Sequence, residues 1–137
     1  MPEQTTAYGI SVTVPLSYAA AVEKTRAELA REGFGVLTEI DVRQTLKDKL
    51  GAEFRPYVIL GACNPPLAHR ALTAERDIGL LLPCNLIVYA TDRPGETVVA
   101  AMDPVAALSL ARKPEVEPLA REVRQRLERV LAAVATS

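Results

Sequence analysis

The chain has 137 residues, of which 49% are hydrophobic, 24% charged and only 4% aromatic. This composition is typical of one globular domain, residues 1–137, with an aliphatic core, and it excludes a disordered chain. The formal net charge of −1 and the lack of a basic block argue against nucleic-acid binding, and no apolar run is long enough to span a membrane. The amino terminus lacks a signal-peptide pattern, so we expect a cytoplasmic location.

The first part of the chain predicts a strand, a helix and a second strand. Apolar residues alternate with small or polar ones over Tyr8–Val14, which indicates a strand with one buried face. Ser17 is a good N-cap for the following helix, and Gly33 supplies its C-terminal stop. Residues Phe34–Asp41 then predict the second strand.

The middle part predicts a short helix, a third strand and another helix. Asp41, followed by glutamine three residues later, has the capping-box pattern for a helix that ends at Gly51. Tyr57–Ala62 is nearly continuous in apolar residues and predicts a buried strand. The run Asn64–Pro66 places a cap before prolines at a helix start, and that helix is expected to end near Glu75.

The last part predicts a hairpin and two helices. Residues 77–83 fit either a buried turn or a short strand. Strands are expected over Asn85–Ala90 and Thr97–Met102, because a turn-forming segment separates them. A short helix is expected over 104–112, and a long amphipathic helix over Pro118–Ala135.

This order of elements favours an α+β fold, with a largely antiparallel sheet covered by the long helices. The strand, helix and strand at the beginning leave a doubly wound α/β sheet as the alternative.

Rare residue types gather in one segment of the chain. Its two cysteines, Cys63 and Cys84, are each followed directly by one of its two asparagines, Asn64 and Asn85. The single histidine, His69, lies between the two pairs. These side chains offer metal coordination, nucleophilicity and adaptable hydrogen bonding, so the segment is where we expect chemistry.

Three stretches of the chain are distinctive together: Phe34–Asp41 followed by Leu46–Lys47, Tyr57–Pro65 with Ala68 and His69, and Leu80–Asn85. They resemble a widespread family known only as domain of unknown function 302. The resemblance covers nearly the whole chain. It implies an α+β fold similar to the TATA-binding-protein type and association as a homodimer, but no established activity.

A metal site is one reading of the rare residues. In an antiparallel sheet the third strand would end beside the start of the next, which would bring Cys63 near Cys84, with His69 in the helix between them. Two thiols and an imidazole suit zinc or copper. Three ligands leave a zinc shell incomplete, however, and the alternative is two buried thiols with asparagines that cap helices or close turns.

A reactive thiol is a second reading. Cys63 would lie just outside a helix start, where free amide groups and the helix dipole favour a thiolate, and His69 would act as acid or base. A disulfide between Cys63 and Cys84 is a further alternative if the two sulfurs reach bonding distance.

A third group of polar residues lies near the second strand. Glu39 and Asp41 share one face of that strand, and Arg55 and Tyr57 follow at a short distance in sequence. Together they could form a polar ligand site. The alternative is that Asp41 only caps a helix, while Glu39 faces solvent or pairs with Arg55.

The sequence therefore predicts a module that binds a small ligand or a metal, zinc or copper, in the cytoplasm and as a homodimer, without nucleic acid or membrane. The alternative function is a thiol-dependent enzyme or redox protein that uses Cys63 with His69. The expected binding residues are Cys63, Asn64, His69, Cys84, Asn85, Glu39 and Arg55.

Overall fold

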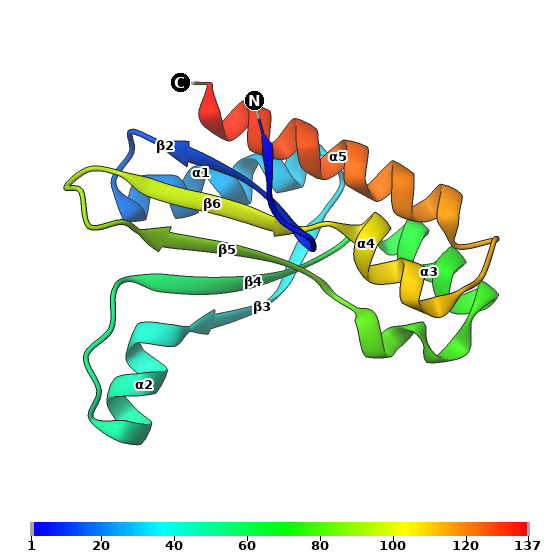
Figure 1. Ribbon diagram of the computed structural model, residues 1–137, viewed down its shortest axis with the longest axis horizontal. Helices are drawn as coiled ribbons and strands as arrows, with labels where there is room; N and C mark the ends of the chain where they lie inside the picture. The colour runs from blue at the N-terminus through cyan, green and yellow to red at the C-terminus, as the bar shows by residue number, and fades with distance from the viewer. Residues whose placement is uncertain (1, 137) are drawn as a thin grey trace.

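A six-stranded sheet organises the chain in the computed structural model, which describes residues 2–136 (Figure 1). The strands are β1 (Glu3–Thr6), β2 (Gly9–Val14), β3 (Gly35–Asp41), β4 (Tyr57–Cys63), β5 (Cys84–Ala90) and β6 (Thr97–Met102). The α-helices are α1 (Tyr18–Arg31), α2 (Val42–Leu50), α3 (Pro65–Ala74), α4 (Pro104–Leu108) and α5 (Glu117–Ala135). Two 3-10 turns, η1 (Arg76–Leu81) and η2 (Ser109–Ala111), follow α3 and α4.

The strand order is β1-β2-β6-β5-β4-β3, and every neighbouring pair is antiparallel. The prediction of an α+β fold is therefore confirmed, and the doubly wound alternative is wrong. The reason is that α1 carries the chain from β2 to the far edge of the sheet, so that β3 runs antiparallel beside β4 rather than parallel beside β2.

The two long helices, α1 and α5, lie together on one side of the sheet (Figure 1). The strands contribute alternate residues to this side, such as Val12 and Val14, which are 6% and 1% exposed. Helix α5 presents Leu127 and Leu131, both fully buried, from successive turns of one face. The period-two and helical patterns of the sequence thus meet in one aliphatic core.

Side-chain caps begin three of the helices where the sequence predicts them. Ser17 Oγ accepts from the Ala20 amide at 3.2 Å, and Asn64 Oδ1 accepts from the Leu67 amide at 3.2 Å. Asp41 Oδ1 accepts from the Gln44 amide at 2.9 Å. The capping box at α2 is only half formed, because the Gln44 side chain donates to Asp48 instead of returning to the cap.

Some elements differ from the prediction. Strand β1 was not expected, because its residues are polar and it is held by backbone pairing with β2 at the sheet edge. The ambiguous segment 77–83 is mostly the 3-10 turn η1, and α4 ends at Leu108 before a second such turn. Among the described residues, no helix combines the length and the apolar character needed to cross a membrane.

A buried carboxylate joins the end of the sheet to α5. Asp103 is 4% exposed and caps α4 by accepting from the Val105 amide at 2.9 Å. Its second oxygen accepts from Arg124 Nη1 of α5 at 2.5 Å. The ion pair therefore fixes α4 against α5, and this junction forms one side of the site described below.

Arg124→Ala is expected to destabilise the protein, because it leaves the Asp103 carboxylate buried without its cation. The loss should be about 2 kcal/mol or more, somewhat below that of a fully buried pair since Arg124 is 30% exposed. Urea unfolding measures it. Arg129→Ala on the same helix is the matched control, because its ion pair with Glu32 is exposed and its loss should change stability little. Equal effects of the two substitutions would contradict the role given to Asp103.

Candidate functional site

The antiparallel register brings the two cysteines to the same end of the sheet. Ala62 of β4 lies opposite Cys84 of β5, so Cys63 is one residue away from the residue that faces Cys84. On the other side of β4, Cys63 lies opposite Gly35 of β3. Both thiols are free, and both line a cavity at this end of the sheet.

The cavity has a volume of about 330 Å³ and is enclosed by parts of the chain that are distant in sequence. Its walls come from the ends of β3, β4 and β5, from α3 and η1, and from α4 and α5. Most of the lining side chains are aliphatic, and Phe34 is the aromatic one. None of the described residues that line the cavity carries a charged side chain. An apolar hollow of this size is a typical small-molecule site.

The polar atoms of the Cys–Asn pair at β4 have different surroundings. Asn64 is 7% exposed, and its side-chain oxygen is occupied by the cap of α3. Cys63 is half-buried and lies at the cavity wall. The Cys63 thiol is thus the more accessible of the two sulfurs, and Asn64 serves mainly to start the helix that closes the cavity.

Cys84 is buried, with 6% of its surface exposed. Burial raises the pKa of its thiol to about 11, and the nearby Cys63 sulfur adds to the rise by repulsion between the two thiolates. The thiol is therefore protonated at neutral pH, and it acts in the cavity as a small apolar group rather than as a nucleophile.

A glycine allows the cavity wall to close. A Cβ placed on Gly61 of β4 would lie 2.2 Å from Thr38 Oγ1 and 2.8 Å from Pro83 Cγ. Thr38 belongs to the cavity wall from β3, and Pro83 belongs to it from the segment before β5. The absence of a side chain at position 61 is thus what lets these two walls approach each other.

His69 and Asn85 do not join the cysteines. His69 is exposed on α3 and is not among the residues that line the cavity. Asn85 is exposed and lines a separate hollow of about 590 Å³ on the sheet, together with Tyr8 and Tyr89. The structure therefore divides the expected cluster: Cys63, Asn64 and Cys84 share one cavity, whereas the imidazole and the second amide lie elsewhere.

Both placements have a signal in the sequence. Leu67, Ala68, Ala71 and Leu72 share the cavity face of α3, and this helical spacing leaves His69 on the outer side. Asn85 directly follows Cys84 in a strand, and neighbouring strand residues point to opposite faces. The helical and strand periodicities of the sequence could therefore have shown that His69 and Asn85 point away from the cavity.

The predicted metal ligands find no matching arrangement. Within residues 2–136, no group of three His, Cys, Asp or Glu side chains is placed so that it could hold a metal ion. The two thiols lack a third ligand because His69 lies outside their cavity. The geometry thus gives the zinc or copper hypothesis no support.

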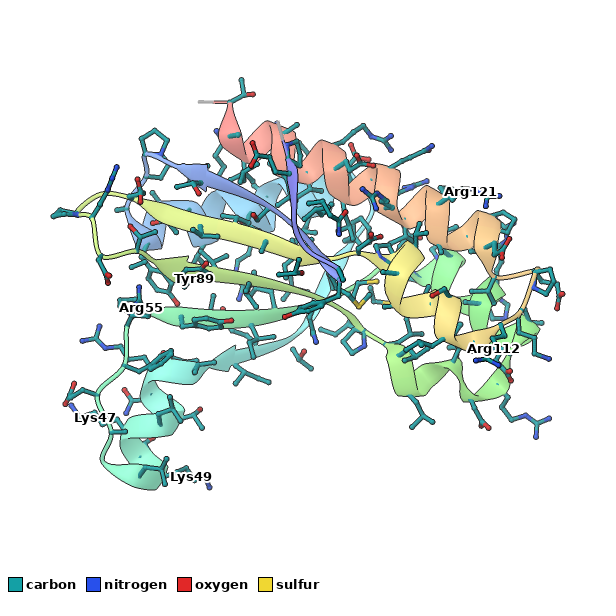
Figure 2. All side chains as sticks on the ribbon, viewed as in Figure 1. Lys47, Lys49, Arg55, Tyr89, Arg112 and Arg121 are labelled. Carbon is teal, nitrogen blue, oxygen red and sulfur yellow. The ribbon has the colours of Figure 1, made fainter. Side chains whose placement is uncertain are left out.

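The polar residues near β3 are also separated. Glu39 accepts a hydrogen bond from Arg26, whereas Arg55 donates to the Ala90 carbonyl at 3.1 Å and pairs with Asp92 at 3.2 Å. The alternative in which Asp41 caps a helix and Glu39 faces solvent is therefore confirmed, whereas Glu39 does not pair with Arg55. Figure 2 shows Arg55 toward the end of the sheet that is away from α3 and α4, so it does not border the cavity.

Much of the cavity was not predicted from the sequence. Leu119 and Val123 of α5 and Leu108 of α4 line it, although they follow Cys84 by 24 residues or more in the chain. Their apolar periodicity indicated buried faces but not which part of the sheet those faces would cover. Only the packing of α5 across the sheet assigns them to this site.

Comparisons with known proteins agree with the fold. A family model described as "Domain of unknown function DUF302" matches residues 10–134. The chain is similar to the crystal structure of an uncharacterized conserved protein DUF302 from Bacillus stearothermophilus, with a TM-score of 0.86 and 31% sequence identity. This similarity covers 94% of the chain and 99% of that protein. No protein with a curated description matches the chain.

Gly61→Ala is expected to lower the free energy of unfolding by about 1–3 kcal/mol, because the new methyl group would overlap Thr38 and Pro83. Gly35→Ala is the matched control on the neighbouring strand, since a Cβ there meets nothing within 4 Å. Chemical denaturation of both variants measures the difference. A Gly61→Ala protein as stable as the wild type would mean that the wall is not closed as described.

The raised pKa of Cys84 predicts a loss of stability at high pH. The unfolded thiol ionises near pH 9 while the folded one keeps its proton to about pH 11, so stability is complete below about pH 9 and is lost as pH rises towards 11. The loss should be on the order of 2 kcal/mol. The free energy of unfolding, measured at several pH values in this range, should fall less steeply with pH in Cys84→Ala than in the wild type. In Cys63→Ala it should fall nearly as steeply as in the wild type. An unchanged slope in Cys84→Ala would contradict the assignment.

Proposed function

The chain belongs to the DUF302 family, whose description gives no activity, and we propose from the structure itself that it binds a small apolar molecule. The site is the cavity of about 330 Å³ beside Cys63, Asn64 and Cys84. The observation that carries this proposal is the chemistry of its wall, which is aliphatic and free of charged side chains among the described residues.

The energetics of burial favour an apolar ligand over a polar one. Apolar surface that leaves water contributes roughly 25 cal/mol per Å², and the cavity offers aliphatic contacts from three strands and several helices. A charged or strongly polar group would lose its hydration without a matching partner, which costs several kcal/mol. The same reasoning makes a hydrated metal ion a poor occupant.

A thiol-dependent reaction is the second candidate, because Cys63 is half-buried at the wall of the same cavity. Its expected partner, His69, is exposed outside the cavity, so any reactivity of Cys63 would have to be independent of this histidine. The binding proposal needs no such reaction and accounts for the same geometry, and we therefore prefer it.

We also propose that the protein is a homodimer that buries the face of the sheet opposite α1 and α5. This face carries half-buried Ile59, Ile87 and Tyr89, and the rings of Tyr57 and Tyr89 stack with centroids 5.3 Å apart. Figure 2 shows Tyr89 toward the end of the sheet near which Arg55 also lies. This apolar surface, around a hollow of about 590 Å³, could pack against the identical surface of a second copy. Because the net charge of the chain is only −1, electrostatic repulsion between two copies would be weak.

The cytoplasm is the proposed location. Two free cysteines support it, because thiols close to each other in an oxidising compartment tend to be paired.

Ala68→Leu is expected to reduce the binding of an uncharged apolar fluorescent probe, such as N-phenyl-1-naphthylamine, by about tenfold, because the larger side chain fills the cavity from α3. His69→Leu is the matched control, since it introduces the same side chain at the next residue but outside the cavity. Fluorescence titration measures both. A larger loss of binding in His69→Leu than in Ala68→Leu would reject the cavity as the site and favour a role for the imidazole.

Ile87→Asp is expected to convert the dimer to a monomer, because it places a charge in the proposed interface. Leu110→Asp is the control, since Leu110 is 71% exposed on η2, at the α3 and α4 end of the molecule. Light scattering coupled to size exclusion gives the mass, and circular dichroism checks that both variants remain folded. A wild-type protein that is monomeric at all concentrations would refute the dimer.

A further inference from the structure

Two polar groups of buried residues in the cavity wall offer little to a ligand. The Asn64 side-chain oxygen accepts from the Leu67 amide, and burial keeps the Cys84 thiol protonated at neutral pH. Most of the other side chains in the wall are aliphatic, and they come from α4 and α5 as well as from the sheet. The remaining polar side chains, Thr38 and Cys63, are neutral, and they are exposed and half-buried respectively. The buried part of a ligand therefore meets mainly hydrocarbon and finds no charged partner for a charged group of its own.

The mouth of the cavity is apolar as well. Leu37 of β3 and Leu72 of α3 both line the cavity, yet they are 67% and 42% exposed. Leu80, next to the cavity residue Gly79, is 88% exposed. Leucine side chains that are exposed to water at the opening lack the stabilisation that burial would give them. An apolar ligand that extends outward from the cavity would cover them and gain this stabilisation.

The wall also distinguishes a chain from a ring. Phe34 is the one aromatic residue among the described residues that line the cavity, so a flat ligand would find no pair of rings to stack between. Leucine, alanine and valine side chains instead contact a flexible methylene chain equally well along its length. The apolar interior and the apolar rim thus form one continuous track.

We propose that the cavity holds the alkyl tail of a single-chain amphiphile, such as a fatty acid, with the polar head in water beyond Leu37 and Leu72. The tail enters first, and the methylene groups near the head cover the rim leucines. This inference rests on the proposed binding function and specifies the class of its ligand.

A series of straight-chain fatty acids tests the proposal. Chains of about 4 to about 14 carbons, kept below their aggregation concentrations, are titrated into the full-length protein by displacement of the fluorescent probe. Each added methylene should tighten binding roughly fourfold until the cavity and rim are covered, which corresponds to about 0.8 kcal/mol per methylene. Beyond that length the increase should level off.

The substitution Leu72→Gln tests the contact between the ligand and the rim of the cavity. It should weaken the binding of short and long chains by similar factors, several-fold in each case, because the head stays in water and the methylene groups next to it contact the rim whatever the chain length. Leu110→Gln is the control, since that leucine is also exposed, at 71% against 42% for Leu72, but lies outside the cavity. A loss of binding for the long chains with no effect on the short ones would overturn the proposed orientation, because it would place the head of a short chain in the interior.

Other outcomes distinguish the two proposals. If compact ring compounds displace the probe while the fatty acids show no dependence on length, the alkyl-tail proposal is overturned and the binding function stands. If neither class displaces the probe from a saturable site, both fail. Binding to phosphatidylcholine vesicles without binding of monomeric fatty acids would also overturn the proposal, because it would indicate a membrane surface as the partner instead of a free amphiphile.

Discussion

The antiparallel pairing of β4 with β5 is the constraint on which the site depends. It sets Ala62 opposite Cys84 and Gly61 opposite Asn85, and a one-residue shift of this register would turn the side chains of the shifted strand to the opposite face of the sheet. Gly61 adds a steric condition, because Thr38 and Pro83 approach it more closely than any side chain at that position would permit. The cavity is thus a consequence of strand register together with one missing side chain.

The two faces of the sheet have separate roles. One face packs against α1 and α5, and its residues are buried in an aliphatic core (Figure 1). The other carries half-buried isoleucines and tyrosines without a helix over them, a feature that a second copy of the chain would complete. The cavity lies at the end of the sheet, where α3 and α4 extend the helical layer, so ligand binding and association would use different surfaces.

The chemistry of the cavity follows from burial more than from the identity of its rare residues. Cysteine and asparagine first suggest coordination or catalysis, yet Cys84 is protonated by burial and Asn64 is engaged in capping α3. Once these roles are assigned, the wall presents little except hydrocarbon. Cys63, Asn64 and Cys84 therefore position and line the site, and the neighbouring leucines set the chemistry of the ligand that we propose.

The sequence by itself determined the helices and most of the strands, because period-two and helical patterns and the caps Ser17, Asp41 and Asn64 act locally. It also located the segment of the site, since antiparallel strands joined through α3 must place Cys63 near Cys84. The same local periods could have placed His69 and Asn85 outside the cluster. Strand β1 could not be predicted in this way, because its residues are all polar and it pairs through its backbone with β2 at the sheet edge.

Only the tertiary structure decided that these residues surround an apolar cavity. Its walls include Leu119 and Val123, whose helical pattern indicates burial but not the surface that buries them. Likewise, Arg55 pairs with Asp92 and Glu39 with Arg26, partners that depend on how loops and helices approach the sheet. Contacts between distant segments arise from the packing of whole elements, and a pattern read along one segment contains no information about its neighbours in space.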